Sequence, residues 1–162
     1  MGKRQGVPGF GLPRPGEGKR GEEGYLGYLM RQAAGAYRNR CERDLKDLGI
    51  TTAQFTVMTM IAAYPGHSGA DLARIALLTP QTVSVIIANL EKSGLVSRSP
   101  HAVHGRIQQL DLTDAGRDRL AAARKKIHAL DGALRHSLSK EDEQVVRRWL
   151  VAVAIDHGEG AN

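Results

Sequence analysis

The alternation of apolar and polar positions in the middle of the chain predicts a helix between Thr79 and Gly94. Its apolar side chains recur at helical spacing and form one stripe, at Val83, Ile86, Ile87 and Leu90. Thr79 suits the N-cap, because its hydroxyl can accept a hydrogen bond from a backbone N–H that otherwise lacks a partner. Pro80 follows at the first helical position, where its missing N–H costs nothing. Gly94 indicates a tight stop.

The outward side of this helix carries side chains that are short or uncharged, apart from a lysine at its end: Gln81, Ser84, Val85, Ala88 and Lys92. Short side chains let a helix backbone approach another surface closely. In a DNA major groove, glutamine bonds adenine edges, serine bonds bases or phosphate, and valine or alanine contacts a thymine methyl. This face therefore suits a major groove, although it also fits an ordinary surface helix.

Two strand-like runs follow the helix, over residues 95–98 and 106–112. Leu110 and Leu112 alternate with polar residues as in a half-buried strand. The connecting residues 99–105 are too many for a two-residue turn, so we expect them to project. Arg98 and Arg106 flank this loop and could place cations against phosphates or in a minor groove. Helix, strand, loop and strand is the order of a winged helix.

Two further helices are predicted upstream, each opened by a capping box. Ser68 and Asp71 open a short helix that ends at a turn near residues 77–78, so it forms a helix-turn-helix with the helix after Thr79. Thr51 and Gln54 open the helix before it, which ends at residues 65–66. The fold class predicted is mainly α with a small β-hairpin wing (α+β), in which a winged helix-turn-helix over residues 50–112 is joined to a helical dimerisation region.

Two short motifs at a fixed distance give the chain a family resemblance. The first is Leu90-Glu91-Lys92-Ser93-Gly94-Leu95-Val96, followed by Arg98, and the second is Leu112-Thr113-Asp114-Ala115-Gly116. From about residue 25 to residue 153 the chain resembles transcription regulators of the MarR (multiple antibiotic resistance regulator) family. The resemblance implies a homodimer with a winged helix-turn-helix in each subunit, controlling transcription at a near-palindromic operator. We expect a repressor that responds to a small-molecule or other effector.

The chain departs from the family pattern in the wing, where an acidic residue is also replaced at His101, and in the recognition helix. Many members have Asp-x-Arg in the wing, where this chain has His104-Gly105-Arg106, so Arg106 keeps the wing-arginine position without its acidic partner. Many members also have arginine where Val85 stands.

These patterns together predict the contacts with double-stranded DNA. The predicted contact residues are Ser68, Arg74, Thr79, Pro80, Gln81, Thr82, Ser84, Val85, Asn89, Arg98, His101, His104 and Arg106. Gln81, Thr82 and Ser84 are expected to discriminate bases. Arg74, Arg98 and Arg106 are expected to supply mostly phosphate affinity.

The helices at the two ends of the ordered chain, over 25–48 and 113–157, are predicted to form a dimer. A helix opened by Ser139 and Asp142 carries part of the apolar surface, and the helix beginning at Thr113 carries a narrow apolar seam. The dimerisation residues predicted are Leu26, Leu29, Leu130, Leu134, Leu138, Trp149, Leu150 and Val153. The alternative is a helical layer packed within one chain.

An effector pocket is predicted between the dimer helices and the DNA-binding lobe, with Tyr37, Arg40, Cys41 and Met58 as candidate contacts. Each of these side chains also suits simple packing. Cys41 as an oxidant sensor is a further alternative, since Arg40 and Arg43 lie close in sequence. No cofactor is predicted, although His101 and His104 supply half of a zinc site, so a zinc-responsive regulator is another alternative.

Composition and charge narrow the class of protein. The 162 residues carry a net charge of +6, which favours a polyanionic partner. The single cysteine fits a reducing cytoplasm, and neither a membrane span nor a secretion signal is expected. Catalytic motifs such as Gly-x-Ser-x-Gly or a Walker loop do not occur, so an enzyme is not expected. A non-specific architectural DNA-binding protein is the closest rival.

The chain is expected to hold a single domain over residues 25–157 between two tails. Residues 1–24 are rich in glycine and proline and mildly basic, which predicts a disordered tail. A tail of this charge could also act as an arm that contacts DNA. Residues 158–162 form the second tail.

Overall fold

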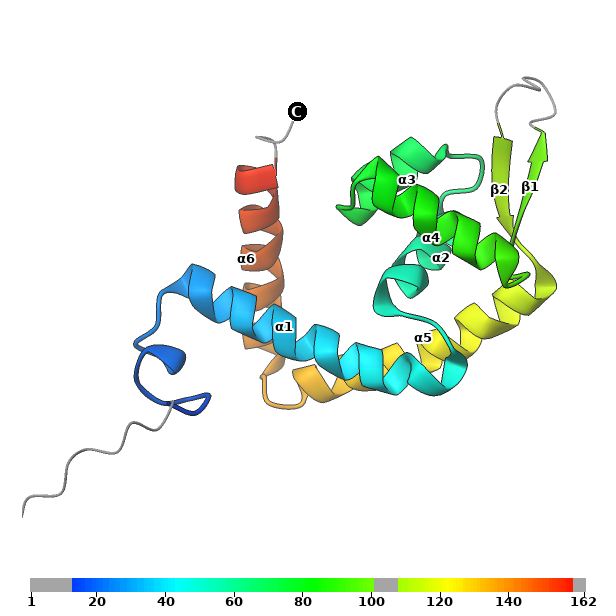
Figure 1. The fold of residues 1–162 in the computed structure, drawn as a ribbon. Helices are drawn as coiled ribbons and strands as arrows, with labels where there is room; N and C mark the ends of the chain where they lie inside the picture. The colour runs from blue at the N-terminus through cyan, green and yellow to red at the C-terminus, as the bar shows by residue number, and fades with distance from the viewer. Residues whose placement is uncertain (1–12, 101–107, 159–162) are drawn as a thin grey trace, which may run out of the picture. The chain divides into compact units, whose positions relative to one another are not determined.

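The computed structural model describes residues 13–100 and 108–158, and the chain divides into two compact units, residues 1–40 and 41–162. The described helices, with their bounds, are α1 (Leu26–Leu45), α2 (Thr52–Ala63), α3 (Gly69–Ala76), α4 (Pro80–Lys92), α5 (Asp114–Arg135) and α6 (Lys140–Gly158) (Figure 1). Strands β1 (Val96–Pro100) and β2 (Gln108–Leu112) pair antiparallel, and short 3-10 helices occur at η1 (Gly18–Arg20) and η2 (Lys46–Leu48). The predicted fold class, helical with a small hairpin, is confirmed.

Residues 13–24, near the start of the first unit, have more regular structure than their composition predicts. Residues 13–24, which the sequence predicts to be a disordered tail, form turns and η1. Arg20 holds this segment together, because its Nη1 donates to the Pro13 carbonyl at 2.7 Å and its Nε donates to Gln32 Oε1 on α1 at 3.2 Å. A single arginine therefore links the turn segment to the helix that follows it.

The predicted capping boxes form at α2 and α3. At α2, the backbone N–H of Gln54 donates to Thr51 Oγ1 at 3.1 Å, and the Thr51 N–H donates back to Gln54 Oε1 at 2.9 Å. At α3, the corresponding bonds between Ser68 and Asp71 are both 3.2 Å long. Each box satisfies two backbone donors at a helix start that would otherwise lack partners.

The turn between α3 and α4 is closed by a residue in the left-handed region. Leu77 has φ 54°, and it alone among the described non-glycine residues has a positive φ. The N–H of Leu78 donates to the Ala73 carbonyl at 3.0 Å, which is the reversal usually made with glycine. The chain bends by 113° between the two helices, as a helix-turn-helix requires.

Helix α4 begins and ends where the sequence predicts. The Thr82 N–H donates to Thr79 Oγ1 at 3.1 Å, with Pro80 at the first helical position. At the other end Gly94 has φ 68°, and the N–H of Leu95 donates to the Leu90 carbonyl at 2.9 Å. The apolar stripe is buried at Val83, Ile86, Ile87 and Leu90.

The core of the second unit lies between α2, α3, α4, α5 and the hairpin. Its largest fully buried side chains are Leu45, Val57, Met58, Leu72, Val83 and Leu90. The hairpin closes one side, with Val96 opposite Leu112 and Arg98 opposite Leu110. Val96, Leu110 and Leu112 are buried. Both strands begin and end within two residues of the predicted bounds. The predicted projecting loop lies largely within residues 101–107, outside the described residues.

The two family motifs meet at the junction of α4 and α5. The Thr113 hydroxyl donates to the Gly94 carbonyl at 2.6 Å and accepts from the Gly116 N–H at 3.0 Å. The Thr113 N–H donates to the Leu95 carbonyl at 3.1 Å. A Cβ on Gly116 would collide with the Leu95 carbonyl oxygen, so the first turn of α5 needs glycine there. The backbones of the two motifs are therefore in direct contact.

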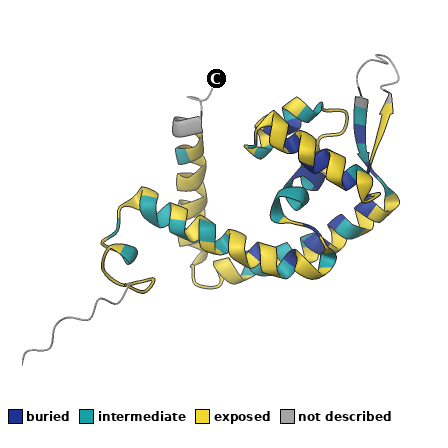
Figure 2. Cartoon of the chain, in the orientation of Figure 1, coloured by how far each residue is buried: buried dark blue, intermediate teal, exposed yellow. Residues whose placement is uncertain are grey.

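Helix α6 differs from the rest of the second unit because none of its described residues is buried (Figure 2). Its exposed large apolar side chains are Val145, Val146, Trp149, Leu150, Val151 and Ile155, and Leu134 and Leu138 are exposed at and after the end of α5. Val153 and Leu130 are half-buried. In the first unit, Leu26 is exposed and Leu29 is half-buried. The residues predicted for dimerisation are thus partly or fully accessible in the single chain.

Candidate DNA-binding surface

The outward face of α4 is a continuous exposed surface with no charge until its last turn. The exposed residues on this face are Pro80, Gln81, Thr82, Ser84, Val85, Ala88, Asn89 and Lys92. Residues 81–90 contain no ionisable side chain. Helix α5 shows the usual alternative, since it exposes Arg117, Asp118 and Lys125. The α4 face therefore has the short, uncharged side chains that can approach base edges.

The first turn of α4 is held in place by a local hydroxyl pair. Thr79 caps the helix, and its hydroxyl lies 2.8 Å from the Thr82 hydroxyl. Both threonines are exposed. Gln81 and Ser84 are also exposed, and they follow directly on this capped helix start.

Ser68 and Arg74 lie at the two ends of α3, and Asp71 connects them. The Ser68 hydroxyl donates to Asp71 Oδ2 at 2.6 Å, and Arg74 Nη1 lies 3.5 Å from Asp71 Oδ1. Hydrogen bonds from the Ser68 side chain and backbone, with a smaller effect of Arg74, lower the pKa of Asp71 below its ordinary value. The Arg74 side chain is 81% exposed, so it can leave this weak surface pair for a phosphate.

Arg98 on β1 is directed by Glu91, a residue that the sequence analysis did not assign. Arg98 Nε donates to Glu91 Oε1 at 2.8 Å, and both side chains remain partly exposed. The arginine stands at a shallow hollow of about 280 Å³, lined by Gly69, Ala70, Pro80, Ser84, Ile87, Arg98 and Leu110. The fold thus brings three predicted contact residues, Pro80, Ser84 and Arg98, to one recess. Glu91 belongs to the first family motif, seven residues before Arg98, so the sequence contained both partners of this ion pair.

The remaining predicted DNA contacts lie in the wing. His101, His104 and Arg106 fall within residues 101–107, outside the described residues. Their predicted roles stay predictions.

The candidate effector contacts are distributed over both units. Tyr37 and Arg40 belong to the first unit, and Cys41 and Met58 belong to the second. Cys41 is 1% exposed and Met58 is fully buried. Burial of this kind is typical of an inert structural cysteine, whereas a sensor thiol is partly exposed.

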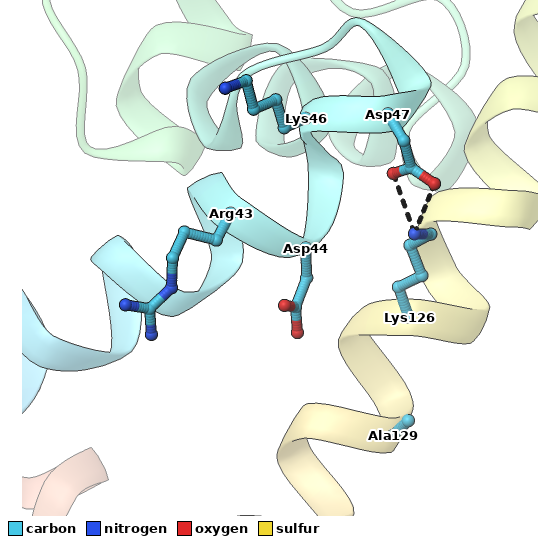
Figure 3. Close-up of a pocket in the computed structure, with 6 residues that line it drawn as sticks. All are labelled: Arg43, Asp44, Lys46, Asp47, Lys126 and Ala129. Carbon is cyan, nitrogen blue, oxygen red and sulfur yellow. Dashed lines mark hydrogen bonds and ion pairs between the residues drawn. The ribbon is translucent and has the colours of Figure 1, made fainter.

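A separate open cleft lies within the second unit, where η2 faces α5 (Figure 3). It is lined by Arg43, Asp44, Lys46, Asp47, Lys126 and Ala129. Lys126 Nζ lies 2.8 Å from both carboxylate oxygens of Asp47 and lowers the pKa of that carboxyl. Arg119 also donates to the Leu48 carbonyl, so two cations of α5 attach to the segment joining α1 and α2.

The described residues contain neither a cluster typical of a metal site nor a single membrane-spanning helix. No group of three or more histidine, cysteine, aspartate or glutamate side chains comes together there. The zinc prediction rests on His101 and His104, which lie outside that part of the chain. No single described helix is long and apolar enough to cross a membrane, although α3 and α4 taken as a bent pair pass the same test of length and composition.

A helix-turn-helix with an uncharged outward face and a hairpin beside it is typical of DNA-binding transcription regulators. Comparisons with known proteins support the same class of protein. The MarR family model matches residues 48–107. The HTH-type transcriptional repressor Rv2887 of Mycobacterium tuberculosis is 30% identical over 81% of this chain and 94% of its own length. The chain belongs to the MarR family.

Two solved structures of the Mycobacterium tuberculosis relative are also similar. Its complex with DNA matches 80% of this chain and 97% of that chain, with 29% identity and a TM-score of 0.63. Its complex with salicylic acid matches 80% of this chain and 96% of that chain, with 30% identity and a TM-score of 0.65. The protein is therefore a DNA-binding regulator and not an enzyme.

Proposed function

We propose that this protein is a repressor that binds a near-palindromic operator as a homodimer. The observation that carries the proposal is the exposed α4 face, which is uncharged from residue 81 to residue 90 and fixed at both ends by backbone caps. Gln81 and Ser84 would read base edges, while Arg74 and Arg98 would contact phosphates. The relative Rv2887 is named a repressor and is known in complex with DNA, which supports the same role here.

The proposed dimer rests on the accessible apolar surface of α6 and the end of α5. Val145, Trp149 and Val153 recur at a spacing of four and share one side of α6. A soluble monomer rarely exposes so large an apolar patch, and a second copy of the chain is the simplest cover. Two recognition helices related by a two-fold axis would then enter successive major grooves about one helical turn apart.

An effector is the finer part of the proposal. The relative Rv2887 binds salicylic acid in a solved structure, which supports a small-molecule effector for this chain. An anionic compound would suit the cleft where η2 faces α5, because its three cations, Arg43, Lys46 and Lys126, outnumber its two carboxylates, Asp44 and Asp47. Such a compound would compete with Asp47 for Lys126 and so change how α5 holds the segment before α2. We expect a cytoplasmic location, where the operator is.

The direct test is binding to DNA from upstream of the protein's own gene, compared with a scrambled duplex over a salt series. We expect the operator to bind at least about 1,000-fold more tightly than the scrambled duplex. Equal, steeply salt-dependent binding to several upstream regions and to the scrambled duplex would instead indicate the architectural alternative. Arg74→Ala should weaken both duplexes and flatten the salt slope, whereas Gln81→Ala should reduce mainly the preference for the operator.

A further inference from the structure

Val85 occupies the middle of the α4 recognition face and presents an apolar side chain to solvent. It is 57% exposed, whereas its neighbours Val83, Ile86 and Ile87 are buried. The residues one turn away on the same face are Gln81 and Thr82 on one side and Ala88 and Asn89 on the other. Val85 is therefore ringed by small or uncharged groups and not by the lysines and glutamates of a solvated helix.

The chemistry of the major groove limits what this valine can contact. In the major groove, guanine presents two acceptors, adenine presents an acceptor and a donor, and cytosine presents an amino donor. The apolar group among the unmodified bases is the C5-methyl of thymine. A polar base edge placed against Val85 would lose water without gaining a hydrogen bond, which is unfavourable. A thymine methyl placed there would lose water and gain a contact, which is favourable.

The flanking amides extend the same preference. Gln81 and Asn89 lie four residues before and after Val85, and both are exposed. Glutamine and asparagine make paired hydrogen bonds to adenine. Residues 81–90 offer no arginine or lysine to pair with guanine, and the first cation on the face is Lys92, in the last turn.

We propose that Val85 reads the C5-methyl of a thymine in each half of the operator, within a stretch rich in A·T pairs. This inference rests on the proposed function, because it names the base sequence that the same surface selects. Val85 is then a specificity residue that acts by shape and apolar contact. Gln81 and Asn89 would select adenines at neighbouring positions by paired hydrogen bonds. Arg74 and Arg98 would contact phosphates and so add affinity that does not depend on the base sequence.

The first step of the test is to select sites from a duplex pool with a randomised core, using the full-length wild-type protein. We expect a recurrent site with a thymine at one symmetric position per half. Deoxyuridine then replaces that thymine, which removes the methyl and leaves base pairing intact. Wild-type affinity should fall about fourfold when one half-site is changed and roughly 15-fold when both are changed.

A double-mutant cycle assigns the effect to Val85. Val85→Ala should bind the thymine and deoxyuridine sites equally, because the contact is already lost. Val151→Ala is a matched control, since Val151 is 59% exposed on α6, on the opposite side of the helix from Trp149 and Val153. It should keep the full wild-type sensitivity to deoxyuridine. Val85→Arg should move the preferred base at this position to guanine in a repeated selection.

The outcomes separate this inference from the proposed function. Failure to select any site would remove the proposed function and this inference with it. A selected site whose thymines are all insensitive to deoxyuridine would overturn the inference and leave the regulator intact. Sensitivity at a thymine that persists unchanged in Val85→Ala would overturn it as well, because another residue would then read the methyl.

Discussion

Helices α4 and α6 are both rich in valine, isoleucine and leucine, yet they differ in how far these side chains are buried. Helix α4 buries Val83, Ile86, Ile87 and Leu90 in the core of the second unit and exposes a polar face with Val85 in its middle. Helix α6 buries none of its described residues, and even Trp149 is 39% exposed. The recognition helix is therefore packed against the core of its own unit, whereas the described large apolar side chains of α6 remain accessible to solvent.

The winged helix and the helical ends therefore differ in how much of their apolar surface is buried within one chain. The winged helix has a buried core of its own, so we expect its recognition face to keep its shape without a second subunit. In the proposed dimer, the helical ends of the two subunits would cover each other's apolar residues. Substitutions in the winged helix should therefore change stability or base preference, whereas substitutions in α6 should change the oligomeric state.

The largest expected effect comes from placing charges on the apolar side of α6. The double substitution Trp149→Asp with Leu150→Asp should give a folded monomer, because these side chains contribute little to the core of the single chain. Specific affinity for the operator should fall by at least about 100-fold, since a monomer makes the contacts of one half-site. Sedimentation velocity and fluorescence anisotropy measure the two quantities. Val151→Asp, on the other side of α6, should remain dimeric, and full operator affinity in the monomeric double variant would contradict the comparison.

The next effect concerns the two ends of α5. Gly116→Ala should lower the free energy of unfolding by about 2–4 kcal/mol, because the new Cβ would collide with the Leu95 carbonyl at the α4–α5 junction. Gly132→Ala, in the same helix, meets no atom within 4 Å and should raise it by about 0.5–1 kcal/mol. Urea unfolding at matched protein concentration compares them. Equal effects of the two substitutions would show that the start of α5 is not in tight contact with the winged helix.

The smallest effect is a change in acid sensitivity at α3. The pKa of Asp71 is below its ordinary value in the folded chain, mainly because Ser68 donates hydrogen bonds to it. The ionised carboxylate therefore stabilises the fold above its ordinary pKa of 3.8, and this contribution is lost as the pH falls through the lower folded value. Asp71→Asn should lose stability less steeply than wild type below about pH 4. Thermal unfolding over an acid series measures the slope, and parallel curves would rule out the contribution.

The features predictable from sequence are those with local causes. The capping residues Thr51, Ser68 and Thr79 bond to backbone groups within three residues, and Gly94 ends α4 through its own backbone conformation. The stripe of α4 follows from helical spacing alone. These interactions need no knowledge of the rest of the chain, so one sequence is enough to find them.

The features that the sequence analysis missed join residues far apart in the chain or depend on side-chain geometry. The contact of Gly116 with Leu95 explains the paired motifs, but its cause appears only when α5 is placed against the end of α4. The pairing of Arg98 with Glu91 depends on where β1 leaves α4. Residues 13–24 were expected to lack structure because their composition buries little, and one side chain, Arg20, ties them to α1.

The mass of the protein alone and on its operator tests the central claim most directly, that one chain holds a complete DNA-reading unit and needs a second copy to cover its helical ends. Sedimentation velocity should give a free species of twice the 17.5 kDa chain and a complex of two chains per selected duplex. A stable 17.5 kDa monomer that binds the selected duplex specifically, with one chain per site, would contradict the account.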